Sequence, residues 1–107
     1  SLSKKEDFKS IISGRKISNK YLTIFFKELS DKNNKKLNIS FVTKKKIGNA
    51  VIRNKIKRRL KNIMNQILKI KKINLKYSYL LIAKKNMIDA KFFDIKETIL
   101  KDYKKIK

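Results

Sequence analysis

The sequence has 107 residues, with Lys+Arg 31 against Asp+Glu 8, a formal net charge of +23 and no Cys or His. This composition excludes disulfides, zinc fingers, thiol nucleophiles and histidine-based acid–base chemistry. No apolar stretch approaches the roughly 20 residues that a membrane span needs, and no signal-peptide core follows the N-terminus. We therefore expect one small, soluble, cytoplasmic domain over residues 1–107, with no membrane partner.

The first half of the chain predicts one helix and two strands. An S-x-x-E capping box occupies residues 3–6, apolar residues follow at helical spacing, and Gly14 is placed to end this helix. Residues 21–29 are aromatic and β-branched, which predicts a strand. Residues 37–43 alternate between apolar and polar side chains and predict a second strand, antiparallel to the first.

The second half predicts a helix, a strand and a helix. The first of these helices begins near Ala50 and places on one stripe the residues Ile52, Ile56, Leu60, Ile63, Ile67 and Ile70. Residues 77–83 are almost continuously apolar, as in a central strand covered on both faces. Asp89 is placed to cap a last helix that carries Phe92, Ile95, Ile99 and Tyr103.

The predicted fold class is therefore α+β: a single-domain sandwich of one small mixed sheet with helices packed on it, in the order α-β-β-α-β-α. The strand–helix–strand unit over residues 37–83 crosses over right-handed by the general rule.

The positive charge is concentrated in the middle of the chain. No Asp or Glu occurs from Lys32 through Met87, and three of the four arginines (Arg53, Arg58 and Arg59) fall within seven residues. Such a single-sign field predicts a nucleic-acid partner. Two other readings are compositional drift toward Lys, and a basic amphipathic helix that lies on a membrane surface.

The acidic residues do not form a catalytic group in the sequence. Glu6, Asp7, Asp94, Glu97 and Asp102 lie on the predicted terminal helices, where we expect them to cap helices or face solvent. Two-metal nuclease chemistry needs three or more acids at one site, and the sequence supplies no such cluster. We therefore predict no catalytic residue and no metal ligand in this chain.

The predicted binding surface is the start and the outer side of the central helix. Gly48 precedes a helix N-terminus, where free N–H groups bind phosphate. The solvent face extends this site through Arg53, Lys57, Arg58 and Lys61, and Asn54 adds an amide that can bond base edges or sugars.

Residues 45–60 (KKIGNAVIRNKIKRRL) closely resemble the signature K-K-x-G-x-A-V-x-R-N-x-x-K-R of the bacterial ribonuclease P protein subunit. The E-D-F of residues 6–8, the I-A-K-K of residues 82–85 and the order of elements are similar as well. The resemblance implies a non-catalytic subunit of an RNA-based endoribonuclease, which helps a catalytic RNA to remove the 5′ leader of precursor transfer RNA. It also implies divalent metal (Mg) at the RNA's active site, no further protein partner and a left-handed crossover.

The resemblance implies two sets of site residues. Those that would contact the catalytic RNA are Lys45, Lys46, Gly48, Asn49, Arg53, Asn54, Lys55, Lys57 and Arg58. A separate cleft for the single-stranded leader would be lined by Phe8, Ile12 and Phe25, although core packing explains Phe8 and Phe25 equally well. The chain departs from the family pattern at Lys55, commonly Arg, at Ile12, usually aromatic, and at Phe25, often Tyr. A structural RNA-binding protein, such as a small ribosomal protein, is the alternative function, and a nuclease that needs no RNA is a third.

Overall fold

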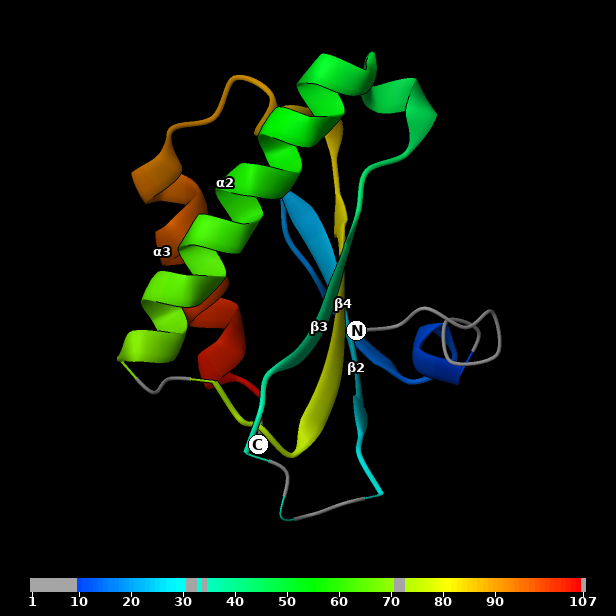
Figure 1. Cartoon of the computed structure of the whole chain (residues 1–107), viewed down its shortest axis with the longest axis vertical. Helices are drawn as coiled ribbons and strands as arrows, with labels where there is room; N and C mark the ends of the chain where they lie inside the picture. The colour runs from blue at the N-terminus through cyan, green and yellow to red at the C-terminus, as the bar shows by residue number, and fades with distance from the viewer. Residues whose placement is uncertain (1–9, 31–32, 34, 71–72, 107) are drawn as a thin grey trace.

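A four-stranded mixed sheet forms the centre of the protein in a computed structural model that describes residues 10–30, 33, 35–70 and 73–106 (Figure 1). Its strands are β1 (Arg15–Ser18), β2 (Leu22–Glu28), β3 (Asn38–Val42) and β4 (Tyr77–Ala83). The spatial order is β1-β2-β4-β3, in which only β3 and β4 are parallel. The predicted α+β class with one small mixed sheet is confirmed.

The last strand of the sequence, β4, lies in the middle of the sheet between β2 and β3. Almost all of its side chains are buried, as its continuous apolar run predicts. The strands β2 and β3 do run in opposite directions, but they are not neighbours, because β4 separates them. The short strand β1 was not predicted, since Ile17 is its single apolar residue.

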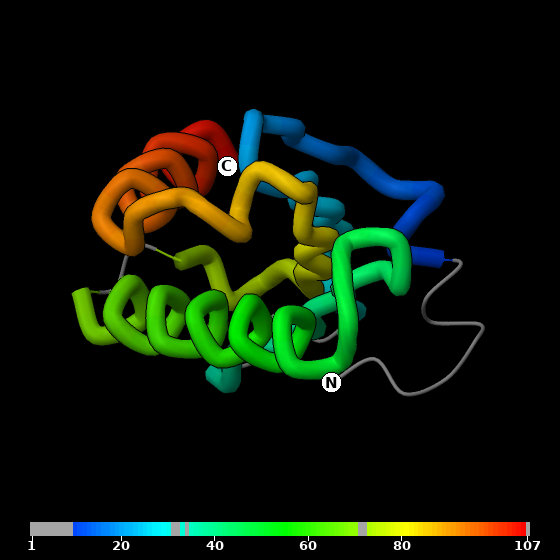
Figure 2. The backbone as a smooth tube through the Cα atoms, turned by 90° about the horizontal axis from the view of Figure 1, so that it is seen from above, coloured from blue at the N-terminus to red at the C-terminus, as the bar shows by residue number. Residues whose placement is uncertain are grey.

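Two long helices cover one face of the sheet, as the two views show (Figures 1 and 2). They are α2 (Ala50–Lys69) and α3 (Phe92–Lys104), and the 3₁₀ turns η1 (Lys45–Ile47) and η2 (Lys85–Met87) precede them. Followed from β3 through α2 to β4, the chain makes a left-handed crossover, as the family resemblance implies and against the general rule (Figures 1 and 2).

The inner stripe of α2 packs against the sheet and α3, burying Ile56, Leu60, Ile63, Met64 and Ile67. The prediction fails at the end of the stripe: Ile70 is 52% exposed, because α2 stops at Lys69. No helix among the described residues is long and apolar enough to cross a membrane.

The last helix carries the predicted apolar residues but begins in a different way. Ile95, Ile99 and Tyr103 are buried in the core. The prediction that Asp89 caps α3 is wrong, because the helix begins at Phe92 and its N-cap residue, Lys91, makes no side-chain cap bond.

The prediction that Asp102 caps a helix or faces solvent is also wrong. It is buried on α3, where its Oδ2 accepts a 2.7 Å hydrogen bond from the amide of Asn19. The Asn19 Oδ1 in turn accepts from the backbone N–H groups of Tyr21 and Leu22. This buried carboxylate therefore joins α3 to the turn before β2.

Of the predicted first helix, the described part is the turn Ser10–Ile12, which is helical. Gly14 follows it, and its N–H donates to the carbonyl oxygen of Ile11 at 3.1 Å. A Cβ at Gly14 would lie 2.9 Å from the carbonyl oxygen of Phe26, so the close approach of this turn to β2 requires glycine. The capping box and Phe8 lie outside the described residues.

Candidate nucleic-acid interface

The N-terminus of α2 is built by a short segment that turns the chain from β3 into the helix. Asn49 is the N-cap, and its Oδ1 accepts a 3.0 Å hydrogen bond from the N–H of Ile52. Gly48 has an extended backbone, and its missing Cβ leaves room for the side chain of Ile52, which would lie 3.1 Å away. Both residues were predicted to bind RNA, and both have a structural role in starting the helix.

The outward surface of α2 forms a shallow hollow, here called the α2 hollow, with a volume of about 550 Å³. Four of the predicted RNA-binding residues line it, together with two apolar residues: Asn54, Lys57, Arg58, Lys61, Phe41 and Val51. All four predicted residues are exposed, and Val51 is 74% exposed. The structure therefore brings three cations and an amide around one concave surface, where they can bond phosphates or sugars.

Arg53 lies deeper than the residues of the α2 hollow. Its side chain is half-buried, and its Nε is buried with no hydrogen-bond partner among the described residues. A buried guanidinium N–H that lacks a partner costs free energy, which an incoming acceptor such as a phosphate oxygen would recover.

Lys55 and Arg59, four residues apart, lie along the flank of α2 that turns from the α2 hollow toward α3, and neither lines the hollow. Arg59 donates from Nη1 to the carbonyl oxygens of Ala90, at 3.0 Å, and Met87, at 3.4 Å. These bonds tie α2 to the segment that leads into α3. Lys55 is exposed beside this packed side and does not line the α2 hollow.

A second basic hollow, here called the lysine hollow, has a volume of about 530 Å³ and lies where η1 meets the end of β4. Its lining includes four lysines from two segments that are distant in the sequence: Lys44, Lys46, Lys84 and Lys85. Lys46 was predicted to bind RNA, and it points to this hollow rather than to the α2 hollow. Lys45 is exposed on η1.

The family model Ribonuclease P matches residues 1–107. The chain belongs to the ribonuclease P protein family. It is 35% identical over 114 residues to the ribonuclease P protein component of Fusobacterium nucleatum, covering 99% of this chain and 96% of that one. It is 32% identical over 108 residues to that of Alkaliphilus oremlandii, covering 98% and 89%.

Solved ribonuclease P proteins have the same fold. The protein from Thermotoga maritima, solved in complex with 1-(4-fluorophenyl)-2-thiourea, superposes with a TM-score of 0.83 at 24% identity and covers all of both chains. The Staphylococcus aureus protein at 2.0 Å gives a TM-score of 0.75 at 25% identity, covering 92% of this chain and 86% of that one.

Membership of the ribonuclease P protein family makes this chain the protein subunit of a ribonucleoprotein endoribonuclease that works with an RNA. It favours the predicted function over the ribosomal alternative. Among the described residues, no group of three or more acidic side chains is placed to hold a metal ion.

Two of the residues that the family resemblance assigned to a leader cleft, Ile12 and Phe25, lie on the other face of the sheet from α2 and α3. The turn of residues 10–12 is on that side (Figure 1), and Ser10 accepts a hydrogen bond from Lys27 of β2. Phe25 has the same orientation as Lys27, two residues further on, and is half-buried. Ile12, in the turn on that side, is 40% exposed, whereas Phe8 lies outside the described residues.

Sequence reasoning missed three features of these basic surfaces. Phe41 was assigned only to strand alternation, but it lines the α2 hollow. Lys84 and Lys85 were noted only for their resemblance to the family, but they complete the lysine hollow. The signal for the two lysines was their place directly after a central strand, whose end lies beside η1. No local signal marked Phe41, because its exposure depends on which strand lies at the sheet edge.

Proposed function

We propose that this chain binds the catalytic RNA of ribonuclease P through the α2 hollow and Arg53, with the start of α2 and the lysine hollow extending the contact. It binds the 5′ leader of precursor transfer RNA on the opposite face of the sheet, beside Phe25 and Ile12, and so promotes leader removal. The observation that carries the first proposal is the convergence of Asn54, Lys57, Arg58 and Lys61 on one exposed concave surface.

The proposed chemistry follows from the side chains present. Lys and Arg neutralise RNA phosphates and release counterions, so the affinity depends steeply on salt. The planar guanidinium of Arg58 can bond two phosphate oxygens at once, and the amide of Asn54 can both donate and accept. The reaction itself is carried out by the RNA partner, whose folded structure this basic surface holds close to the substrate.

The direct test is reconstitution. Purified protein is added to its cognate catalytic RNA at low magnesium, and cleavage of precursor transfer RNA is followed. We expect the protein to restore leader removal that the RNA alone does not support under these conditions. Failure to stimulate cleavage, or cleavage by the protein after the RNA has been removed, would contradict the proposed role.

The α2 hollow is tested by Arg58→Ala, with Lys101→Ala on the exposed surface of α3 as a charge-matched control. Loss of one phosphate contact should lower the slope of log K against log salt by about one unit and weaken binding several-fold. Lys101→Ala should leave both values unchanged. Equal slopes for wild type, Arg58→Ala and Lys101→Ala in filter-binding titrations would move the RNA surface away from α2.

The leader face is tested by Phe25→Ala. Stacking of an unpaired base on an aromatic ring contributes about 1–3 kcal/mol, so the variant should bind precursor transfer RNA more weakly in the reconstituted enzyme. Affinity for mature transfer RNA, which has no leader, should not change. An equal loss for both RNAs would indicate that Phe25 serves packing instead.

A further inference from the structure

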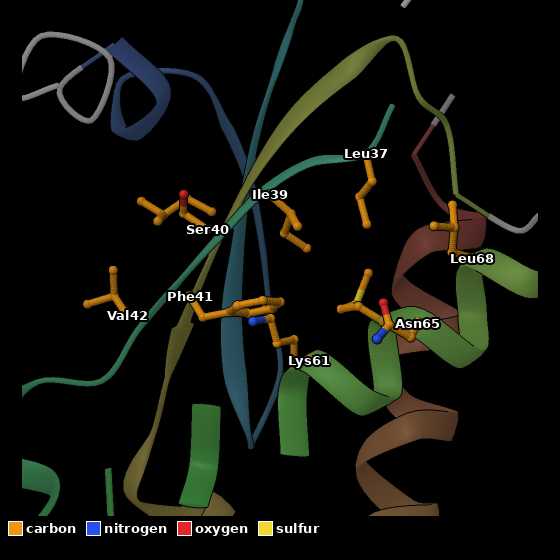
Figure 3. Close-up of a pocket in the computed structure, with 10 residues that line it drawn as sticks. Leu37, Ile39, Ser40, Phe41, Val42, Lys61, Asn65 and Leu68 are labelled. Carbon is orange, nitrogen blue, oxygen red and sulfur yellow. The ribbon is translucent and has the colours of Figure 1, made fainter. Parts of the chain in front are cut away.

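Phe41 stands at the junction of two hollows on the same side of the molecule. The α2 hollow lies on one side of it, and a groove between β3 and the second half of α2, here called the β3 groove, lies on the other. The β3 groove also has a volume of about 550 Å³. Its lining includes Leu37, Ile39, Met64, Asn65 and Leu68, and Phe41 and Lys61 belong to both hollows (Figure 3).

The position of β3 at the edge of the sheet keeps this ring accessible. Within the described part of the chain the strand pairs only with β4, where Phe41 lies opposite Leu81, and all five of its residues are half-buried. Figure 3 shows the side chain of Phe41 pointing from β3 toward α2, with Lys61 reaching into the same space. One part of the ring packs against the core, and the rest borders the two hollows.

The charge around this ring has one sign. Lys57, Arg58 and Lys61 line the α2 hollow together with this ring, Asn54 and Asn65 add amides to the two hollows, and no Asp or Glu occurs among the described residues that line either hollow. An aromatic ring set among cations matches a nucleotide, whose base stacks on the ring while its phosphate meets the cations. A second copy of this chain does not match, because its own charge of +23 repels it.

We propose that Phe41 is a stacking platform for one unpaired nucleobase of the RNA partner, which enters the junction of the two hollows while Lys57, Arg58 and Lys61 hold its flanking phosphates. This inference rests on the proposed RNA-binding role of α2 and adds to it a contact that is not electrostatic. The site is separate from the proposed leader face, since Phe41 points toward α2 and Phe25 lies on the face of the sheet away from both long helices.

The first experiment uses fluorescence. The chain has no Trp, so Phe41→Trp introduces a single reporter at the junction. Its emission should be quenched when the full-length cognate catalytic RNA is added, because a stacked base quenches an indole. The matched control is Phe93→Trp on α3, where Phe93 is 57% exposed and lines neither hollow, and its emission should not change. No quenching at position 41 under conditions in which the RNA is bound would overturn the inference.

The second experiment separates stacking from charge. Phe41→Leu keeps an apolar side chain but loses the ring, so the Kd for the catalytic RNA should rise about ten-fold while the salt slope stays that of wild type. Phe41→Tyr should restore the affinity, and Phe93→Leu should not affect it. Thermal unfolding of each variant shows whether it is folded.

The possible failures are distinguishable. A wild-type affinity for Phe41→Leu, together with a reduced salt slope for Arg58→Ala, would overturn the stacking inference and leave the proposed function intact. A wild-type protein that does not bind the RNA would overturn both. A salt slope reduced by Phe41→Leu would show that the ring only supports the neighbouring cations, and would also overturn the inference.

Discussion

Two adjacent arginines lie on different sides of α2, and one is exposed while the other is part of the packing. Arg58 is exposed, lines the α2 hollow and does not belong to the core. Arg59, one residue later, turns toward α3 and donates to the carbonyl oxygens of Met87 and Ala90. A cluster of arginines in a sequence is therefore not a cluster in space, because each step along a helix rotates the side chain by about 100°.

Arg15 extends this lesson beyond α2. Its guanidinium lies over the rings of Phe26 and Tyr77, 4.8 Å and 5.5 Å from their centroids, and donates to the Tyr77 hydroxyl at 2.8 Å. Two of the four arginines thus hold the fold together, and the other two, Arg53 and Arg58, belong to the proposed RNA surface. Substitutions on the packed side of α2 should therefore change the free energy of unfolding. Substitutions on the exposed side should change the affinity for RNA.

The largest effect is expected on the packed side. Arg59→Ala removes two hydrogen bonds from a charged donor and leaves two carbonyl oxygens without this partner, which should lower the free energy of unfolding by about 2 kcal/mol. Chemical denaturation measures this value, with Arg58→Ala as the neighbouring control that should remain as stable as wild type. The distinction between the two sides would fail if both variants lost stability equally.

A smaller change in the free energy of unfolding, of opposite sign, is expected at Tyr103, a buried residue of α3. Its hydroxyl is buried with no hydrogen-bond partner among the described residues, and its ring packs edge-on against Tyr79. Tyr103→Phe should therefore raise the free energy of unfolding by about 1 kcal/mol at neutral pH. Lower stability of the variant in thermal unfolding would mean that the hydroxyl is well solvated or bonded.

The same variant should change the alkaline limb of the stability curve. Burial, followed by the nearby Tyr79, raises the pKa of Tyr103 well above its ordinary value. The unfolded chain loses this proton near pH 10 while the folded chain keeps it, so wild-type stability falls as the pH rises above about 10. Tyr103→Phe should show a shallower fall over the same range.

The smallest expected effect is a difference in RNA affinity between substitutions at two exposed lysines of α2. Lys57 and Lys55 are both exposed and two residues apart, but only Lys57 lines the α2 hollow. Lys57→Ala should weaken binding of the catalytic RNA by about three-fold, with a lower salt slope, and Lys55→Ala should do so less. Equal losses in salt titrations would show that the RNA wraps both sides of the helix.

Periodicity was sufficient to predict the elements that carry strong apolar patterns. The strands β2 and β4, the start of α2 and the apolar face of α3 all follow from local spacing. The cap at Asp89 and the burial of Ile70 were predicted wrongly, because both depend on where a helix ends and on what lies beside it. The strand β1 has too few apolar residues to produce a pattern, and it forms through backbone pairing with β2.

The exposure of Phe41 and the burial of Asp102 depend on tertiary neighbours, which local sequence patterns do not reveal. The insertion of β4 between β2 and β3 places β3 at the sheet edge, and this alone makes Phe41 accessible beside the basic residues of α2. The burial of Asp102 likewise depends on Asn19, which is 83 residues away in the sequence. The signature of residues 45–60 indicated an exposed helix face correctly, but RNA binding by this face and the roles of its individual residues remain predictions.

The central place of β4 has a consequence for biosynthesis. A ribosome makes the chain from its N-terminus, so β2, β3 and the whole of α2 leave the exit tunnel before the strand that joins them. Until residues 77–83 emerge, β3 has no partner along either edge and the apolar stripe of α2 has only part of its support. The basic helix α2 is thus synthesised before the strand that completes the sheet on which it packs. A nascent chain that stops before Tyr77 exposes the cationic residues of α2 without a complete sheet.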